Sequence, residues 1–269
     1  MPSRLDDAVK QIGIKPKYRD EHVALYHAKC EDILAKIKPD KNTTIISDPP
    51  YGIKWVHSHN PVPIIGDDKP FDPTHLLAHR CVLFGGQHYH TRLPAQGSWL
   101  IWDKRCPHCG GKKACEVGPC HTNDIGDFED IWCSFHAHRT IYRHYWNGFG
   151  KASEKGSHRI HPTQKPVLLM GYLISDHTNP GDLIIDPYAG SCSTLLAARA
   201  SGRYDYRQIP IPPKMRAALK TQSSSPATSS AATPPTSTSR DRRDGRPAQR
   251  SRSRPNSRTT SSPATASDA

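Results

Sequence analysis

A strand that stops at two prolines constrains this sequence most. The β-branched run at residues 43–47 (Thr-Thr-Ile-Ile-Ser) is typical of a buried strand, and Asp48-Pro49-Pro50-Tyr51 follows it directly. In open α/β sheets, ligands bind beyond the carboxyl ends of the strands. We therefore expect this tetrapeptide to face a ligand.

The tetrapeptide combines groups that suit an amine on a planar base. The Asp48 carboxylate and a backbone carbonyl fixed by the two prolines can both accept hydrogen bonds from one NH2 group. The Tyr51 ring offers a face on which a base can stack. The pattern favours methylation of an exocyclic amine, a reaction in which positioning supplies most of the rate. An ordinary turn after a strand is the alternative, since Asp-Pro and Pro-Pro mark turns.

Strands and helices alternate along the rest of the body. Strands are predicted at 22–27, 81–84, 99–102 and 182–186, and helices at 30–37, 166–175 and 193–200. This alternation predicts an α/β fold built on a parallel sheet. Residues 1–20 are polar and are predicted to be peripheral.

A glycine turn joins the last predicted strand to the last predicted helix. It reads Asp186-Pro187-Tyr188-Ala189-Gly190-Ser191-Cys192-Ser193-Thr194. The glycine permits close approach of a ligand, and the N-terminus of the helix offers free N–H groups. An ordinary connection with Ser193 or Thr194 as N-cap is the alternative.

These two segments, with His161-Pro162-Thr163-Gln164-Lys165-Pro166 between them, resemble the amino-group DNA methyltransferases, which make N6-methyladenine or N4-methylcytosine. A catalytic motif that precedes the glycine motif is similar to the circularly permuted arrangement. Tyr145-Trp146-Asn147-Gly148 and residues 151–156 (Lys-Ala-Ser-Glu-Lys-Gly) resemble phage-type members. The resemblance covers residues 22–203.

The resemblance implies a Rossmann-like, circularly permuted methyltransferase sheet, with S-adenosylmethionine as the methyl donor. It also implies double-stranded DNA as the partner, with the target base flipped out. The catalytic residues would be Asp48, Pro49, Pro50 and Tyr51. The cofactor-binding residues would be His161, Thr163, Lys165, Asp186, Pro187, Tyr188, Gly190, Ser191 and Thr194. An aspartate at the first catalytic position favours N6 of adenine, and N4 of cytosine stays open.

The chain departs from the family pattern on the cofactor side. Lys29 stands where the family usually has an aspartate, and Cys192 stands where it usually has a second glycine. After Arg203 the expected strand ending in an acidic residue is missing. These departures keep open a third hypothesis, a catalytically impaired remnant that binds DNA.

Residues 204–269 diverge from the family and are predicted to be mostly disordered. From residue 221 onward they contain no Ile, Leu, Val, Met, Phe, Tyr, Trp or Cys, so they cannot bury enough apolar surface to fold. Their arginines contribute to a net charge of +12, which favours a polyanionic partner. A native basic tail that attracts phosphate is one explanation. A shifted reading frame is the other, and the abrupt change of composition favours it.

A cysteine-rich insert at residues 105–150 occupies the position where this family places target recognition. Cys106, Cys109, Cys115 and Cys120 could surround one Zn²⁺ ion, and a metal-free loop is the alternative. Arg139, Arg143 and Trp146 are predicted to contact DNA, unless the ring packs in the core and the arginines are solvated. Two charged groups are interpreted as solvated: Asp103 with Lys104, and Asp127 with Glu129 and Asp130.

Location and assembly follow from what the sequence lacks. It has no apolar run of about 18 residues, so no membrane span is expected. Its first residues lack the apolar segment of a secretory signal, so we expect a cytoplasmic protein of a bacterium or a phage-infected host, with reduced cysteines. A homodimer stays open. We divide the chain into an N-terminal extension (1–21), a methyltransferase domain (22–203) and a divergent tail (204–269).

Overall fold

A computed structural model describes residues 3–56, 63–108, 126–146, 151–154, 161 and 163–201. The chain divides into two units, residues 1–225 and 226–269, and all described residues belong to the first. The tail predicted to be disordered lies outside the described residues, as do Cys109, Cys115 and Cys120.

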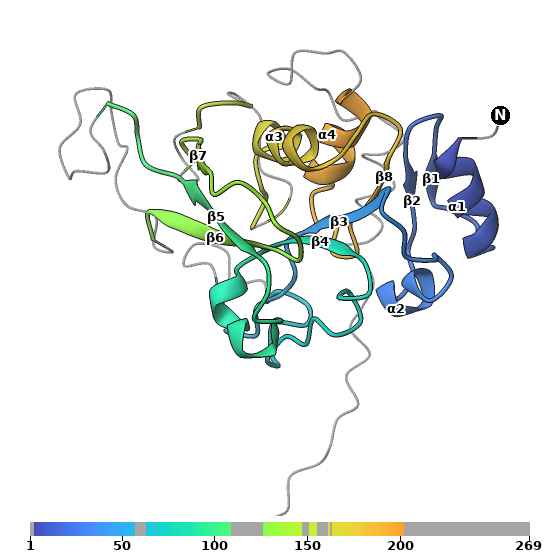
Figure 1. The fold of residues 1–269 in the computed structure, drawn as a ribbon, viewed down its shortest axis with the longest axis horizontal. Helices are drawn as coiled ribbons and strands as arrows, with labels where there is room; N and C mark the ends of the chain where they lie inside the picture. Colours follow the sequence, from blue (N-terminus) through green and yellow to red (C-terminus); the bar gives the residue numbers. More distant parts are fainter. Residues whose placement is uncertain are drawn as a thin grey trace, which may run out of the picture. The chain divides into compact units, whose positions relative to one another are not determined.

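The described part contains one sheet of six strands, in the order β7-β5-β6-β4-β3-β8 (Figure 1). β3 runs parallel to its neighbours β4 and β8, whereas β6 runs antiparallel to both β4 and β5. β7 is parallel to β5. The sheet is therefore mixed rather than wholly parallel, because β6 runs in the opposite direction to its two neighbours, β4 and β5. The strands are β3 (Thr43–Ser47), β4 (Arg80–Phe84), β5 (Ser98–Asp103), β6 (Phe128–Cys133), β7 (Ile141–Arg143) and β8 (Leu183–Ile185).

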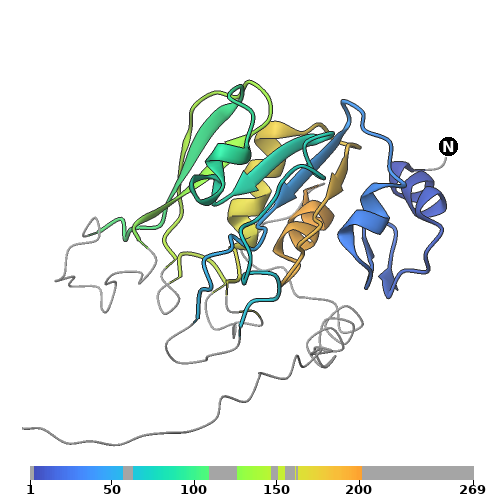
Figure 2. The same cartoon turned by 90° about the horizontal axis from the view of Figure 1, so that it is seen from below.

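The two faces of the sheet bury different side chains. Ile46, Val82 and Phe84 share one apolar cluster with residues of α3 (Val167–His177) and α4 (Ser193–Ala200). These two helices pack against each other on one face of the sheet (Figures 1 and 2). Ile45 and Leu83 belong to the cluster on the other face, where the covering residues include Phe71, Leu76 and Tyr89. This alternation along β3 and β4 is the period-2 pattern of a sheet covered on both sides.

The N-terminal residues form small elements, of which α1 and β1 were not predicted, while β2 lies inside the predicted strand at 22–27. A capping box of Ser3 and Asp6 begins α1 (Arg4–Ile12). β1 (Tyr18–Arg19) pairs antiparallel with β2 (Ala24–Leu25), and α2 (Cys30–Leu34) is shorter than the predicted helix at 30–37. An ion pair of 3.0 Å between Arg199 Nε and Asp20 Oδ2 connects this region to α4.

Two short 3-10 helices follow β4 and lie near the carboxyl end of β3. They are η1 (Gly86–His88) and η2 (His90–Arg92).

Among the described residues, no helix combines the length and the apolar character needed to cross a bilayer.

Candidate active site

Asp48, which the sequence analysis predicted to be catalytic, lies directly after β3, where its carboxylate is held from two sides. Tyr51 Oη donates to Asp48 Oδ1 at 2.5 Å, and Lys165 Nζ donates to Asp48 Oδ2 at 2.8 Å. Lys165 comes from the segment before α3, 117 residues further along the chain. The fold therefore joins two of the motifs that the sequence analysis singled out.

Lys165 extends into a buried row of alternating charges, which we call the ion-pair chain (Lys104, Glu129, Lys165 and Asp48). Lys165 Nζ lies 3.0 Å from Glu129 Oε2, and Lys104 Nζ lies 3.0 Å from Glu129 Oε1. The side chains are 3% exposed for Lys104, 12% for Glu129, 9% for Lys165 and 18% for Asp48.

The interpretation of Lys104 and Glu129 as solvated residues is wrong. Glu129 belongs to β6 and Lys104 follows β5, so both come from paired strands rather than from a surface loop. Each charge is buried against an opposite one, which is the usual condition for burying charge at all. Sequence reasoning missed them because a charged residue beside a loop is most often solvated.

Burial and neighbouring charge act against each other along the ion-pair chain. Burial raises the pKa of Asp48, and Glu129 adds to this effect while Lys165 opposes it. Burial also acts to raise the pKa of Glu129, but Lys165 and Lys104 outweigh it and the pKa is lowered. Burial acts to lower the pKa of Lys165, yet its two carboxylate neighbours raise it. The ammonium of Lys165 is thus kept charged between two carboxylates.

The Tyr51 ring is framed by two residues that follow β4. The His88 imidazole stacks on it, with ring centroids 4.9 Å apart and planes inclined by 17°. At Gly85, where φ is +68°, a Cβ would lie only 2.2 Å from a carbon of the Tyr51 ring. Tyr51 therefore fits only because residue 85 has no side chain. The contact between His88 and Tyr51 was not predicted from the sequence.

Asp67 fixes the backbone that leaves the tetrapeptide. Its buried carboxylate accepts hydrogen bonds from the backbone N–H groups of Gly52 at 2.7 Å, Ile53 at 3.2 Å and Trp55 at 2.6 Å. Sequence reasoning missed Asp67 because it lies in a segment rich in His, Pro, Gly and Asp that reads only as loop. We infer that it preserves the course of the chain beside Tyr51.

The glycine turn also meets the other two motifs. Ser47 Oγ donates to Asp186 Oδ1 at 2.5 Å, and Ser193 Oγ donates to the backbone oxygen of Lys165 at 2.6 Å. The His161 ring lies 3.6 Å from the position of a Cβ on Gly190. Burial raises the pKa of Asp186 to about 6. The three motifs therefore converge at the carboxyl ends of β3 and β8.

The remaining residues predicted to bind a cofactor lie around the same turn. Thr163 Oγ1 is 3.2 Å from His161 Nδ1, and Ser191 Oγ is 2.9 Å from Ser193 Oγ. Thr194 also forms a hydrogen bond to the Asp186 carboxylate. Pro187, Tyr188 and Gly190 keep part of their surface open to solvent.

Of the three departures from the family pattern, the missing strand after Arg203 lies outside the described residues, and the other two lie in different places. Cys192 is fully buried in the apolar cluster beneath α3 and α4, and burial raises the pKa of its thiol to about 12. Its φ of +60° is the left-handed conformation that a glycine adopts with less strain. Lys29 is exposed before α2 and makes no side-chain capping bond.

The residues predicted to contact DNA do not share one environment. Trp146 is 4% exposed and belongs to the core cluster, with the Lys151 ammonium 4.9 Å from its ring centroid. Arg139 and Arg143 are exposed. The packing of Trp146 matches the alternative in which the ring belongs to the core. Cys106 is buried, while the other three cysteines of the predicted zinc site lie outside the described residues.

We predict that Gly85→Ala impairs methyl transfer because the new Cβ collides with the Tyr51 ring. Gly13→Ala is a matched control, since Gly13 has nearly the same φ, +67°, with nothing within 4 Å of the Cβ position. Both substitutions should cost about 1–2 kcal/mol of stability from backbone strain. Only Gly85→Ala should also lower the transfer rate, by about tenfold or more. Equal rates for the two variants would show that the position of Tyr51 does not matter.

Known proteins are similar to parts of this chain. A DNA methylase family model matches residues 112–209. The type II methyltransferase M2.LlaDCHI of Lactococcus lactis subsp. cremoris is 26% identical over 235 residues, which cover 70% of this chain and 85% of that protein. The DNA adenine methyltransferase YhdJ of Escherichia coli is 54% identical over 43 residues, which cover 16% of this chain and 15% of that protein.

Among solved structures, the M1.HpyAVI–SAM complex matches with a TM-score of 0.40 and 24% identity, covering 66% of this chain and 88% of that one. The residues that the family model matches include the segments at 161–166 and 186–194 and begin after the tetrapeptide at 48–51. The chain is therefore similar to the N6/N4 DNA methylases, over residues 112–209 in the case of the family model.

Proposed function

We propose that this chain transfers a methyl group from S-adenosylmethionine to the exocyclic N6 of adenine in double-stranded DNA. The observation that carries the proposal is the Asp48 carboxylate at the end of β3, held by Tyr51 and by Lys165. The backbone of Lys165 is in turn bonded to Ser193 of the glycine turn. One residue thus connects the site for an amine to the turn proposed for the cofactor.

The target amine would be held by Asp48 and the carbonyl of Pro49. Each carboxylate oxygen has two lone pairs, so the bonds from Tyr51 and Lys165 leave Asp48 able to accept another from an NH2 group. That bond aligns the nitrogen lone pair with the methyl carbon. When the nitrogen gains the methyl group it must lose a proton, and Asp48 is the carboxylate placed to receive it.

Tyr51 would provide the stacking surface for the flipped base. The parallel His88 imidazole supports this role, because it is a planar ring already seated on one face of Tyr51. His88 is exposed and lies on the short helix η1, so a base could replace it without disturbing the core. Stacking on a π-face is tolerant of base identity, so selection of adenine would depend on the amine and its neighbours.

The glycine turn fits a ligand with a polar end. Gly190 is exposed, and a Cβ there would meet nothing closer than the His161 ring at 3.6 Å. We assign the cofactor to His161, Thr163 and the turn from Asp186 to Thr194. The cofactor would supply the methyl group, and the chain would orient it towards Asp48. The backbone oxygen of Lys165 accepts a hydrogen bond from Ser193 of this turn, whereas its ammonium donates to Asp48.

The choice of adenine rests on Asp48 at the first catalytic position. The short match to a relative named as a DNA adenine methyltransferase supports it. N4 of cytosine is the alternative on the same site. The insert at 105–150 is the proposed target-recognition segment, and a Zn²⁺ ion on Cys106, Cys109, Cys115 and Cys120 stays a prediction.

The test is to incubate the purified full chain with labelled S-adenosylmethionine and unmethylated DNA, and then to separate the nucleosides. We expect label in N6-methyladenine. Label in N4-methylcytosine would replace adenine with the cytosine alternative. Absence of transfer, with DNA binding retained and no cofactor binding by calorimetry, would support the remnant hypothesis and overturn the proposal.

A further inference from the structure

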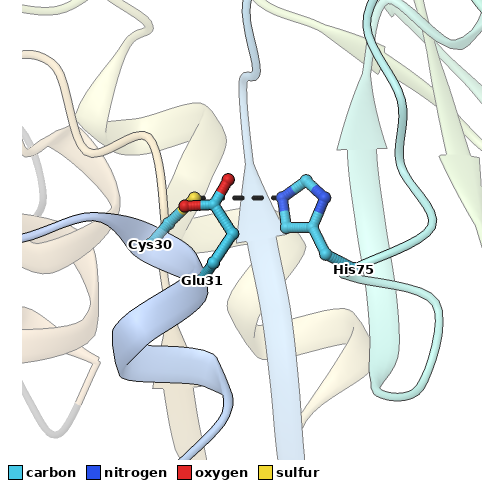
Figure 3. A group of neighbouring side chains, drawn as sticks. All are labelled: Cys30, Glu31 and His75. Carbon is cyan, nitrogen blue, oxygen red and sulfur yellow. Dashed lines mark hydrogen bonds between the residues drawn. The ribbon is translucent and has the colours of Figure 1, made fainter.

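Three side chains with donors of different types converge next to Tyr188 of the glycine turn. Cys30 and Glu31 lie in the first turn of α2, and His75 lies on the connection between β3 and β4 (Figure 3). Their sulfur, oxygen and nitrogen donors all lie within 4.8 Å of one another. Cys30 Sγ is 3.9 Å from His75 Nε2.

We propose that Cys30, Glu31 and His75 bind one Zn²⁺ ion, with the fourth position open to water or to Tyr188. Ligands of a tetrahedral zinc site lie about 2.0–2.3 Å from the metal, which places them about 3.3–3.8 Å from one another. The three donors are already near this spacing, so small side-chain rotations would bring them to it. A thiolate, an imidazole and a carboxylate suit a borderline-soft ion such as Zn²⁺, whereas Mg²⁺ and Ca²⁺ prefer oxygen ligands.

The cluster joins one thiol, one carboxylate and one imidazole, a donor set that suits Zn²⁺. Zn²⁺ would displace the thiol proton to solvent and would then balance one thiolate and one carboxylate. Cys30 and His75 are half-buried and Glu31 is exposed, which leaves a route for the ion.

The cluster touches the glycine turn through Tyr188. His75 Nε2 lies 2.9 Å from Tyr188 Oη, and the Cys30 thiol donates to the same oxygen at 3.6 Å. A metal bound to His75 Nε2 and to the Cys30 sulfur would replace the contacts that these two atoms make with Tyr188 Oη. The phenol would then become the fourth ligand or turn towards the cofactor side. Metal binding would thereby be coupled to the turn, although the metal site itself does not depend on the proposed reaction.

The test uses Co²⁺ as a spectroscopic substitute for Zn²⁺ in the full-length chain after treatment with a chelator. A site that contains a thiolate gives a charge-transfer band, and a tetrahedral site gives intense visible bands. We expect about one Co²⁺ per chain in this site, displaced by Zn²⁺. Cys30→Ser should abolish the charge-transfer band of this site, and His75→Gln should weaken binding by about tenfold or more.

Cys109→Ser is the matched control, because it removes a thiol of the predicted zinc site in the insert and leaves Cys30 in place. Bands that persist in Cys109→Ser and disappear in Cys30→Ser would support the proposal. Bands that disappear only in Cys109→Ser would assign the metal to the insert and overturn it, as would the absence of Co²⁺ binding. Circular dichroism verifies that each variant is folded. Methyl transfer is measured separately, so failure of the proposed function would not alter the metal result.

Discussion

Asp48→Asn should lower the rate of methyl transfer by about a hundredfold or more while the protein stays folded. The amide has the shape of the carboxylate, but it carries no negative charge and cannot accept the proton that the methylated nitrogen must lose. Lys165 would keep its other partner, Glu129, at 3.0 Å, so the substitution leaves no buried ammonium without a counter-charge. The measurement is single-turnover transfer of label from S-adenosylmethionine to DNA.

Asp40→Asn is the matched control for this prediction. Asp40 is an exposed carboxylate that pairs with Arg4 at 3.0 Å, so its removal should not change the rate. The affinity for DNA should be the same in both variants, because Asp48 would act on the target amine after the DNA is bound. A rate within about threefold of wild type for Asp48→Asn would show that the carboxylate is not needed for the transfer.

The elements whose bounds were predicted best are short segments with a clear local sequence signal. The predicted strand at 43–47 and the predicted helix at 193–200 match β3 and α4 in both bounds. Both sequences give strong local signals, a β-branched run before two prolines and a helix of small and apolar residues. The capping box of Ser3 and Asp6 was also a visible signal, yet α1 was missed because its residues are mostly polar.

The sequence predicted the motifs of the candidate site but not all of the side chains that contact them. Asp48, Lys165 and Asp186 were each singled out, and the fold does bring their segments together. The partners Glu129 and Asp67 were not foreseen as part of the site, because nothing local distinguishes a buried carboxylate from a solvated one. Their burial follows from strand pairing and loop closure, which are long-range consequences of the fold.

β6 was not predicted as a strand, and its antiparallel direction was therefore missed as well. Alternating strands and helices predict parallel neighbours, but β5 and β6 are joined by a long insert that does not follow this rule. This reversal has a direct consequence for the site. It brings Glu129, near the start of β6, opposite Trp102 on β5, close to Lys104 and to the carboxyl end of the parallel strands.

Lys165→Met should lower the free energy of unfolding by about 3–5 kcal/mol, because it leaves the buried Asp48 carboxylate without its cation and leaves Glu129 paired with Lys104 alone. Asp48 and Glu129 both contact the Lys165 ammonium, at 2.8 and 3.0 Å, and its side chain is only 9% exposed. Methionine preserves most of the apolar stem, so loss of charge dominates the effect. Denaturant unfolding measures the difference. Lys36→Met, at an exposed lysine, is the control and should change stability by no more than about 0.5 kcal/mol.

A double variant separates the ion pair from simple loss of packing. Asp48→Asn in the Lys165→Met background removes the stranded charge, so the double variant should be more stable than Lys165→Met alone, with a coupling of about 1–3 kcal/mol. Additive effects would mean that the two side chains do not interact in solution. Recovery of stability without recovery of methyl transfer would establish that the contact between Asp48 and Lys165 has a role in stability and a separate role in the reaction. Lys165 then stabilises a buried carboxylate in the fold, and that carboxylate is the group that the reaction requires.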